Sequence, residues 1–323
     1  MIIVQTPLRI SLFGGGTDFP DYFRAEGGIV LSSAIDKYIY VIIKERFDDQ
    51  IRVSYTATEI VNRVDDIRHE IVREAMKLTG IKGSVEIVTM GDVPAGTGLG
   101  SSGTVSVGAL HAFHTYCRQT ISMEQLAREA CKIEVDILKK PIGYQDQYIA
   151  SYGGLRFFEF LEDGSVGHQT IEIDPEISTQ LGDRLMLLYS GTTRKSETIL
   201  TEQKNNIHNN LTALGKLKEI TCEARIALTE GRLDDIGSLL HESWELKKSL
   251  AAGINNGKLG EIYQTARKAG ALGGKITGAG GGGFLLLYCT PDKKEKVRSA
   301  LSHLKELPFH LEPNGSRVVF NLH

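Results

Sequence analysis

One stretch decides the fold of this chain: Pro94-Ala95-Gly96-Thr97-Gly98-Leu99-Gly100-Ser101-Ser102-Gly103. It follows a strand-like run from Ser84 to Thr89, and it precedes a run from Val105 to Tyr116 whose apolar residues recur at helical spacing. Because glycine carries no Cβ, alternating glycines let successive N–H groups turn toward one anion. The helix that begins at the serines adds unpaired N–H groups and the positive end of its dipole. The stretch therefore predicts a phosphate-binding loop.

Two well-known glycine motifs do not fit this loop. Gly98-x-Gly100-x-x-Gly103 matches the dinucleotide fingerprint, but that motif needs a second strand ending in an acidic residue about 20 residues on. Glu124 falls at that distance, inside a helical pattern. A P-loop needs a lysine after the glycines, and none is present. A turn that only packs a helix on a sheet remains an alternative, but it does not account for Ser101-Ser102, whose hydroxyls suit phosphate or Mg²⁺ chemistry.

Composition narrows the class of protein. The chain has 323 residues, enough for two domains, and Lys+Arg 37 against Asp+Glu 40 gives a net charge of −3, which does not suggest a nucleic-acid surface. Its 4 cysteines lack metal-site spacing and are expected to be buried free thiols. No run approaches the ~20 apolar residues of a membrane span, and Met1 to Pro7 do not resemble a signal peptide. We expect a cytoplasmic protein that binds neither nucleic acid nor membrane, with homo-oligomerisation left open.

A second glycine cluster ends the first predicted strand. Leu8, Ile10 and Leu12 alternate with Arg9 and Ser11, and Gly14-Gly15-Gly16-Thr17-Asp18 follows at once. Arg9 and Asp18 bracket the glycines, an arrangement that can hold opposite charges near one small ligand. The alternative is a surface arginine with an ordinary turn aspartate.

Carboxylates come next along the chain. Ser122-x-x-Gln125 is a capping box that opens a helix to about Leu138, with Glu134 near its far end. After Pro141, a short helix begins around Asp146, which stands between two glutamines. A carboxylate held by amides suits a general base or a cation partner. A plain aspartate in the first turn of a helix is the alternative.

The remaining patterns place the other elements. The segment from Asp174 to Gly182 is expected to be a loop at the domain boundary, and residues 196–250 are helical with a break at Gly231. Asp292 to Leu304 and Arg317 to Leu322 are expected to complete a β-α-β-like end. Other expected strands are 28–44, 51–55, 155–160 with its hairpin partner 170–173, 185–189 and 284–288; other expected helices are 65–78 and 259–268.

A third cluster, Lys275-Ile276-Thr277-Gly278-Ala279-Gly280-Gly281-Gly282-Gly283, precedes a buried strand. Five glycines in the six positions from Gly278 leave almost no side-chain bulk beside whatever the loop faces. A flexible linker is the alternative, but linkers do not lie between a patterned helix and a buried strand. The cluster therefore supports phosphate chemistry.

Together the three clusters, in this order and over nearly the whole chain, resemble the GHMP kinases, the superfamily of galactokinase, homoserine kinase, mevalonate kinase and phosphomevalonate kinase. The resemblance implies an α+β fold of two domains with the active site between them. Residues 1–180 would form a ribosomal protein S5 domain 2-like N-terminal domain. Residues 181–323 would form a ferredoxin-like C-terminal domain.

The resemblance also implies site residues. Asp146 would be the catalytic base, Arg9 would steady the transferring phosphoryl group, and Ser102 with Glu134 would hold Mg²⁺. The residues implied to bind ATP are Pro94, Gly96, Gly98, Leu99, Gly100, Ser101, Ser102 and Gly103. Those implied to bind the acceptor are Gly15, Gly16, Thr17, Asp18, Gly278, Gly280 and Gly281, and Arg194, helped by Lys195, is expected to read a distal phosphate.

The substrate expectation rests on two strings. Leu12 to Asp18 resembles the kinases that act on D-glycero-D-manno-heptose 7-phosphate, and Pro141 to Gln147 resembles the sugar-1-kinase branch. The expected reaction is ATP-dependent phosphorylation of the anomeric hydroxyl to the 1,7-bisphosphate, for nucleotide-activated heptose synthesis. Galactokinases show Gly-Glu-His where this chain has Gly15 and Gly16, which counts against galactose. The alternatives are a kinase for an unphosphorylated sugar such as fucose or galactose, and a non-catalytic sugar sensor. Retention of Arg9, Glu134 and Asp146 argues against the sensor.

Overall fold

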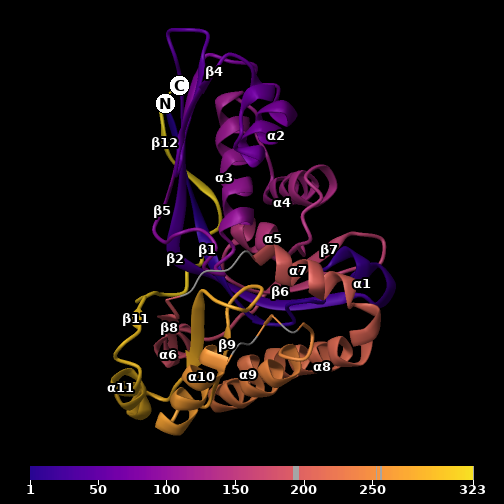
Figure 1. The fold of residues 1–323 in the computed structure, drawn as a ribbon, viewed down its shortest axis with the longest axis vertical. Coiled ribbons are helices and arrows are strands. Elements are labelled where there is room, and N and C mark those ends of the chain that lie inside the picture. The colour runs from indigo at the N-terminus through magenta and orange to yellow at the C-terminus, as the bar shows by residue number, and fades with distance from the viewer. Residues whose placement is uncertain (192–195, 252, 255–256, 323) are drawn as a thin grey trace.

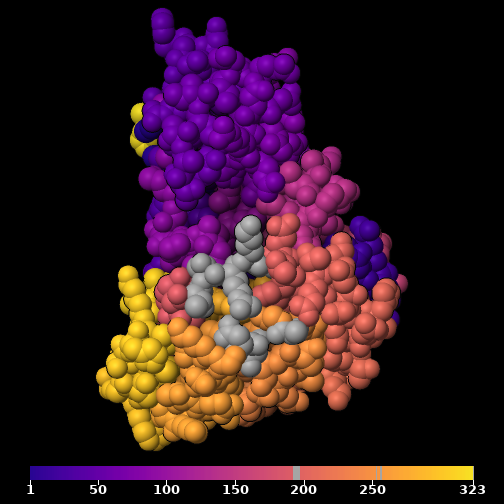
Figure 2. Space-filling view, in the orientation of Figure 1, coloured from indigo at the N-terminus to yellow at the C-terminus, as the bar shows by residue number. Residues whose placement is uncertain are grey.

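The computed structural model describes residues 1–323 except 192–195, 252, 255, 256 and 323. The chain forms two lobes, each built on its own β-sheet (Figure 1). Most of the first half of the chain lies in the upper lobe of Figure 2, and the lower lobe holds most of the second half. The expected α+β class is confirmed.

The first sheet has eight strands. Its main path runs β12-β1-β2-β5-β3-β4, and the β6–β7 hairpin attaches to β2. The 18-residue β2 organises the sheet, because its first part pairs with β6 and its last part with β5. The strands are β1 (Ile2–Phe13), β2 (Gly28–Glu45), β3 (Ile51–Ser54), β4 (Thr58–Val61), β5 (Val85–Gly91), β6 (Leu155–Phe160), β7 (Val166–Thr170) and β12 (Arg317–Asn321).

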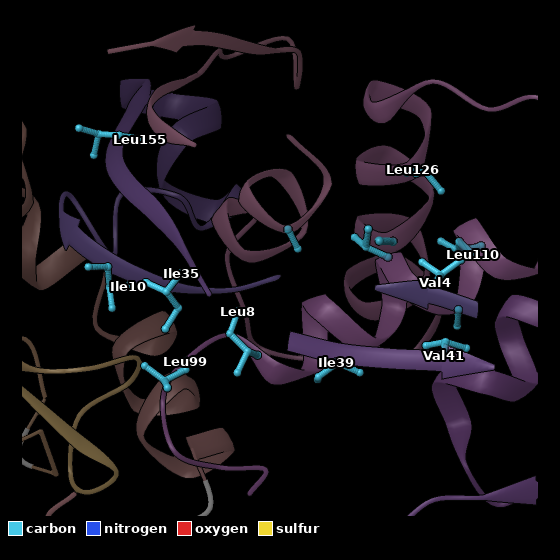
Figure 3. Packing of buried hydrophobic residues seen from close by; sticks show 14 of the residues in the cluster. Val4, Leu8, Ile10, Ile35, Ile39, Val41, Leu99, Leu110, Leu126 and Leu155 are labelled. Atoms are coloured by element: carbon cyan, nitrogen blue, oxygen red, sulfur yellow. The ribbon is translucent and has the colours of Figure 1, made fainter. Parts of the chain in front are cut away.

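Helices cover one face of this sheet (Figure 1). The helical elements of this part of the chain are α1 (Pro20–Glu26), a 3₁₀ turn (Val64–Asp66), α2 (Glu70–Thr79), α3 (Ser101–Tyr116), α4 (Met123–Cys131), a π-helical turn (Lys132–Ile137) and α5 (Gln145–Tyr152). The central helix α3 packs on β1 and β2 and is buried from Gly103 to His114 except at the half-buried Val105. Leu99 fills the core beneath the glycine loop, in one cluster with Leu8 and Ile35 (Figure 3). Burial of such a side chain contributes about 1.5–3 kcal/mol and fixes the loop to the sheet.

The second sheet is fully antiparallel, with the order β11-β8-β10-β9. Its strands are β8 (Leu185–Tyr189), β9 (Gly273–Ile276), β10 (Phe284–Tyr288) and β11 (Lys305–Glu306). The helices of this half are α6 (Pro175–Arg184), α7 (Ser196–Asn205), a 3₁₀ turn (His208–Asn210), α8 (Leu211–Thr229), α9 (Leu233–Lys247), α10 (Gly257–Ala269) and α11 (Pro291–Ala300). Among the described residues, no helix is long and apolar enough to cross a membrane.

The end of the chain returns to the first lobe. Strand β12 pairs with β1 rather than with the second sheet, so the expected β-α-β end is wrong in its last strand; β11 takes the place beside β8. The Ser316 hydroxyl fixes this return because it shares hydrogen bonds of 2.9 Å with Thr6 and with His111 of α3. A division at residues 180 and 181 stays a prediction.

Four other element assignments change. The expected boundary loop is helix α6, because Asp174 caps its N-terminus by accepting from Glu176 N at 2.7 Å. The expected helix from residue 65 begins only at Glu70, and the partner of β6 is 166–170 rather than 170–173. The helix opened by Ser122 becomes a π-helical turn from Lys132.

The 4 cysteines are free thiols as expected, although Cys222 is exposed and Cys117 half-buried.

Candidate active site

A cavity of about 170 Å³ lies where the two lobes meet, and residues from all three glycine clusters line it. The predicted site residues that line this cavity are Arg9, Gly15, Gly16, Asp18, Gly96, Gly98, Gly100, Ser101, Ser102, Gly103, Asp146 and Gly278. Loops far apart in the chain therefore meet at one place. The Thr277 hydroxyl bonds Thr97 O across 180 positions, and Lys275 Nζ donates to Leu12 O at 3.1 Å across 263 positions.

The glycine loop has the backbone that its sequence predicts. Gly96, Gly98 and Gly100 have φ angles of 76°, 83° and 80°, in the left-handed region that glycine adopts without strain. A Cβ on Gly98 would lie 2.6 Å from Thr277 O, so this glycine also lets the third cluster approach. Helix α3 begins at Ser101 and directs its N-terminus at the cavity, which suits an anion.

Two predicted members of this loop do not line the cavity. The Leu99 side chain is buried in the core, and its carbonyl accepts from Arg9 N at 3.1 Å. Pro94 contributes a carbonyl that accepts from the Thr97 hydroxyl at 3.0 Å. Both residues shape the loop rather than face a ligand.

Arg9 and Asp146 form a bidentate ion pair at the cavity. Nε donates to Oδ1 at 2.8 Å and Nη2 to Oδ2 at 2.9 Å, while Nη1 donates to Gly98 O at 2.6 Å. Arg9 is 4% exposed, so three charge-assisted bonds fix a buried cation beside the glycine loop. Because each carboxylate oxygen has two lone pairs, Asp146 can still accept a proton or hydrogen bond from a ligand.

The Asp18 carboxylate also lines the cavity and accepts several hydrogen bonds. Its Oδ1 accepts from Gly16 N at 3.0 Å, and its Oδ2 accepts from Gln145 Nε2 at 3.1 Å and from Gln145 N at 3.3 Å. Burial raises the pKa of this carboxyl group, although the hydrogen bonds from Gly16 and Gln145 act to lower it. Thr17 faces away from the cavity, with its hydroxyl donating to Gly14 O and to Ile29 O at 2.8 Å each.

A second polar cluster lies just behind the loop. The Ser102 hydroxyl bonds Glu134 Oε1, Gln147 Nε2 donates to Oε2 at 2.7 Å, and Lys140 Nζ lies 3.9 Å from Oε1. Glu134 is fully buried, and burial raises its pKa. The π-helical turn, a feature frequent at functional sites, carries Glu134 inward while Asp136 stays exposed.

These two oxygen groups fit Mg²⁺. The ion prefers oxygen ligands and commonly takes few of them from protein, the rest coming from phosphate and water. Glu134 is a buried carboxylate with Lys140 Nζ 3.9 Å from Oε1, and its partner Ser102 lines the cavity. Among the described residues, no group of three or more histidine, cysteine or carboxylate side chains is arranged to hold a metal ion.

Two predicted glycines of the third cluster lie elsewhere. Gly280 and Gly281 do not line the cavity: they pack on Ile254, whose carbonyl accepts from Gly281 N at 2.8 Å. Arg194 and Lys195 lie outside the described residues.

The sequence prediction missed several residues that the structure places in the cavity lining, among them Ser11, Gln145, Gln203 and Lys247. Ser11 could have been found, because it lies two residues after Arg9 on one strand and so shares its face. Gln145 was part of the quoted Gln-Asp-Gln string but received no role. Gln203 and Lys247 lie in helices rich in similar polar residues, so no pattern distinguishes them.

Three buried oxygens at the cavity have no hydrogen-bond partner among the described residues: Ser11 Oγ, Ser101 Oγ and Gln145 Oε1. Each such atom left unpaired costs about 1–3 kcal/mol. Their presence beside Asp18 and the glycine loop therefore indicates a ligand rich in hydroxyl or phosphate groups.

The family models agree with this arrangement. The model for the GHMP kinases N terminal domain matches residues 66–154, and that for the GHMP kinases C terminal matches residues 224–306. Together these matches cover more than half of the chain.

Named relatives point the same way. The chain is 31% identical to D-glycero-alpha-D-manno-heptose 7-phosphate kinase of Campylobacter jejuni over 314 residues, covering 93% of both chains. It is 26% identical to L-fucokinase/L-fucose-1-P guanylyltransferase of Bacteroides fragilis, covering 92% of this chain and 36% of that protein. A solved D-glycero-D-manno-heptose 1-phosphate kinase of Bacteroides thetaiotaomicron matches with TM-score 0.84 at 25% identity, covering 100% of each chain. With the two lobes, the glycine loop and the Arg9–Asp146 pair, these matches show that the chain belongs to the GHMP kinase family and is an ATP-dependent kinase with that family's fold.

Proposed function

We propose that this kinase transfers the γ-phosphoryl group of ATP to the anomeric hydroxyl of D-glycero-D-manno-heptose 7-phosphate, giving the 1,7-bisphosphate. The observation that carries the chemistry is the Arg9–Asp146 ion pair, which lies between the glycine loop and the polar turn at Asp18. The choice of acceptor is supported by the 31% identity to a heptose 7-phosphate kinase over 93% of both chains.

Each part of the cavity has one task in this reaction. The N–H groups of the loop from Gly96 to Gly103 bind the ATP phosphates. The Asp146 carboxylate accepts the proton of the attacking hydroxyl, and the Arg9 guanidinium neutralises charge on the transferring phosphoryl oxygens. Since phosphoryl transfer needs mainly positioning and charge stabilisation, these fixed groups supply most of what the protein must contribute.

Ser102 and Glu134 would hold Mg²⁺. The ion, when bound, supplies positive charge to the triphosphate. Glu134 is suited to the task because its carboxylate is buried, contacts the Ser102 hydroxyl and has the Lys140 ammonium 3.9 Å away.

Asp18, Ser11 and Gln145 would bind the sugar. The Asp18 carboxylate is a hydrogen-bond acceptor for hydroxyls, and the unpaired oxygens of Ser11 and Gln145 complete a polar wall beside it. The absence of a side chain at Gly15 leaves space for the sugar beside these groups. A Cβ there would lie 3.3 Å from Ser11 Oγ and 3.6 Å from Gln145 Nε2.

A kinase for an unphosphorylated sugar is the second candidate. It is favoured by the 26% identity to a protein named L-fucokinase over 92% of this chain. A panel of acceptors with ATP separates the two: heptose 7-phosphate, the dephosphorylated heptose, fucose and galactose. We expect kcat/KM on heptose 7-phosphate to exceed the others by at least about tenfold, which is ~1.4 kcal/mol of selectivity. Equal or higher efficiency on an unphosphorylated sugar would refute the heptose phosphate assignment.

Gly143→Ala tests the sugar site without changing any polar group. A Cβ at Gly143 would lie 1.9 Å from Asp18 Oδ2, so the carboxylate must move and lose its bonds to Gln145. We expect the KM for the acceptor to rise at least about tenfold, while the Kd for ATP stays within about twofold, since ATP binds the other wall of the cavity.

The matched control for this substitution is Gly215→Ala in α8, where an added Cβ meets nothing within 4 Å. Steady-state kinetics with the acceptor varied, and calorimetry with ATP, provide the two measurements. An unchanged KM for the acceptor in Gly143→Ala would show that Asp18 does not bind the sugar.

A further inference from the structure

Lys247 is a buried cation at the cavity to which the proposed reaction gives no role. It is the last residue of α9, it is 6% exposed, and it lines the cavity. Its Nζ donates to Gly278 O at 2.8 Å, and a Cβ on Gly15 would lie 3.8 Å from this Nζ. The ammonium group therefore lies between the turn that contains Gly15 and the third glycine cluster.

Lys247 has no ion-pair partner among the described residues. The charged groups that face it come from four elements: Asp18 after β1, Arg9 on β1, Asp146 on α5 and Lys275 on β9. Burial lowers the pKa of Lys247 to about 8, although the Asp18 carboxylate favours the charged form. Burying an ammonium group is costly in free energy when its one described hydrogen bond is to a carbonyl, and a bound anion would offset that cost.

The other cation in the described lining, Arg9, is held by Asp146 and the glycine loop, and three of its five N–H donors are in use. Arg9 uses Nε and Nη2 on Asp146 and Nη1 on Gly98 O. Lys247 has three N–H donors and spends one of them, on Gly278 O. A phosphate that arrives with the sugar can therefore find its free donors at Lys247.

We propose that Lys247 binds the phosphate group that the acceptor sugar already carries, so that the second lobe supplies the charge selecting a phosphorylated substrate. The inference rests on the proposed function, in which that acceptor is heptose 7-phosphate. A phosphomonoester dianion forms short, strong hydrogen bonds with an ammonium group. The proposal differs from the sequence-based expectation for Arg194, and the two are tested side by side.

The test compares two acceptors across four variants. Kinetics with heptose 7-phosphate and with the dephosphorylated heptose are measured for Lys247→Met, Lys247→Arg, Arg194→Met and Lys248→Met; calorimetric Kd values are used where the free heptose is not turned over. The matched control is Lys248, next along the chain, which pairs with Glu245 at 2.6 Å and does not line the cavity. We expect Lys247→Met to lose about 10- to 100-fold on the phosphorylated acceptor, less than about twofold on the free heptose, and Lys248→Met to lose nothing.

The wild-type enzyme gives an independent readout that does not depend on a variant folding. As pH rises through about 8, the Lys247 ammonium loses its proton, so the KM for heptose 7-phosphate is expected to rise, with a smaller change for the free heptose. In Lys247→Arg this rise should disappear, because guanidinium stays charged. Lys247→Met should unfold at a temperature no lower than wild type, since it removes a charge whose burial is unfavourable.

Each contrary outcome has a distinct meaning. If Lys247→Met loses equally on both acceptors, Lys247 binds a group common to both, and the inference is wrong. If the preference survives Lys247→Met and is lost in Arg194→Met, the phosphate site lies at Arg194 and the inference is again wrong. If wild type shows no preference for the phosphorylated heptose, the proposed function fails first, and the inference falls with it.

Discussion

Asp146→Asn is expected to reduce the rate of phosphoryl transfer by about 10²- to 10⁴-fold while ATP still binds. The amide keeps the shape of the side chain but cannot accept the hydroxyl proton. It also presents an NH₂ group to Arg9, which loses one of its two bonds to the carboxylate. ATP affinity should persist because the glycine loop that would bind the phosphates keeps its own backbone geometry.

Single-turnover rates and a calorimetric Kd for ATP check this expectation. Asp49→Asn is the control, since Asp49 is an exposed aspartate on the loop between β2 and β3. Arg9→Met provides the complementary change: it leaves the carboxylate but removes its cation. A rate above about a tenth of wild type in Asp146→Asn would show that Asp146 is not the base.

The second large effect concerns Mg²⁺. Ser102→Ala and Glu134→Gln are each expected to raise the Mg²⁺ concentration needed for half-maximal activity by about 10- to 100-fold, the usual cost of disturbing a metal's protein environment. The expectation follows from the Ser102–Glu134 contact, which joins two oxygen groups 32 positions apart at the edge of the cavity. Gln147, which donates to Glu134 at 2.7 Å, can still bond the amide oxygen of Glu134→Gln.

Asp136→Asn is the matched control for these variants, because Asp136 lies on the same π-helical turn and is exposed. Activity is measured against Mg²⁺ at saturating ATP, and thermal denaturation without Mg²⁺ separates unfolding from loss of the ion. An unchanged Mg²⁺ dependence in both variants would disprove the magnesium roles of Ser102 and Glu134.

The glycine clusters could be predicted from sequence because their signal is local. Positive φ angles at Gly96, Gly98 and Gly100 are a property of glycine itself, and the helix after them follows from apolar spacing. The type and approximate position of most elements followed from the same periodicities. Helix α6 was missed because Asp174-Pro175 is also a typical turn signal, although the same pair forms an N-cap and first helical residue.

The rest of the site depends on contacts between distant residues. Arg9 and Asp146 were each singled out, but their direct pairing across 137 positions has no signature in either segment. The pairing of β12 with β1 is likewise long-range, and a short strand carries no information about its partner. Lys247 was missed because a lysine at the end of an amphipathic helix usually lies in solvent, and only the packing of α9 under the third glycine cluster buries it.

The identity of the product tests the central claim most directly. Purified protein is incubated with ATP, Mg²⁺ and D-glycero-D-manno-heptose 7-phosphate, and the product is examined by ³¹P nuclear magnetic resonance coupled to the anomeric proton. The expected result is a second phosphorus signal that couples to the anomeric proton while the 7-phosphate signal remains, as in a 1,7-bisphosphate. A new phosphate on any other hydroxyl, or no new phosphate on this acceptor while an unphosphorylated sugar is converted, would contradict the proposed function.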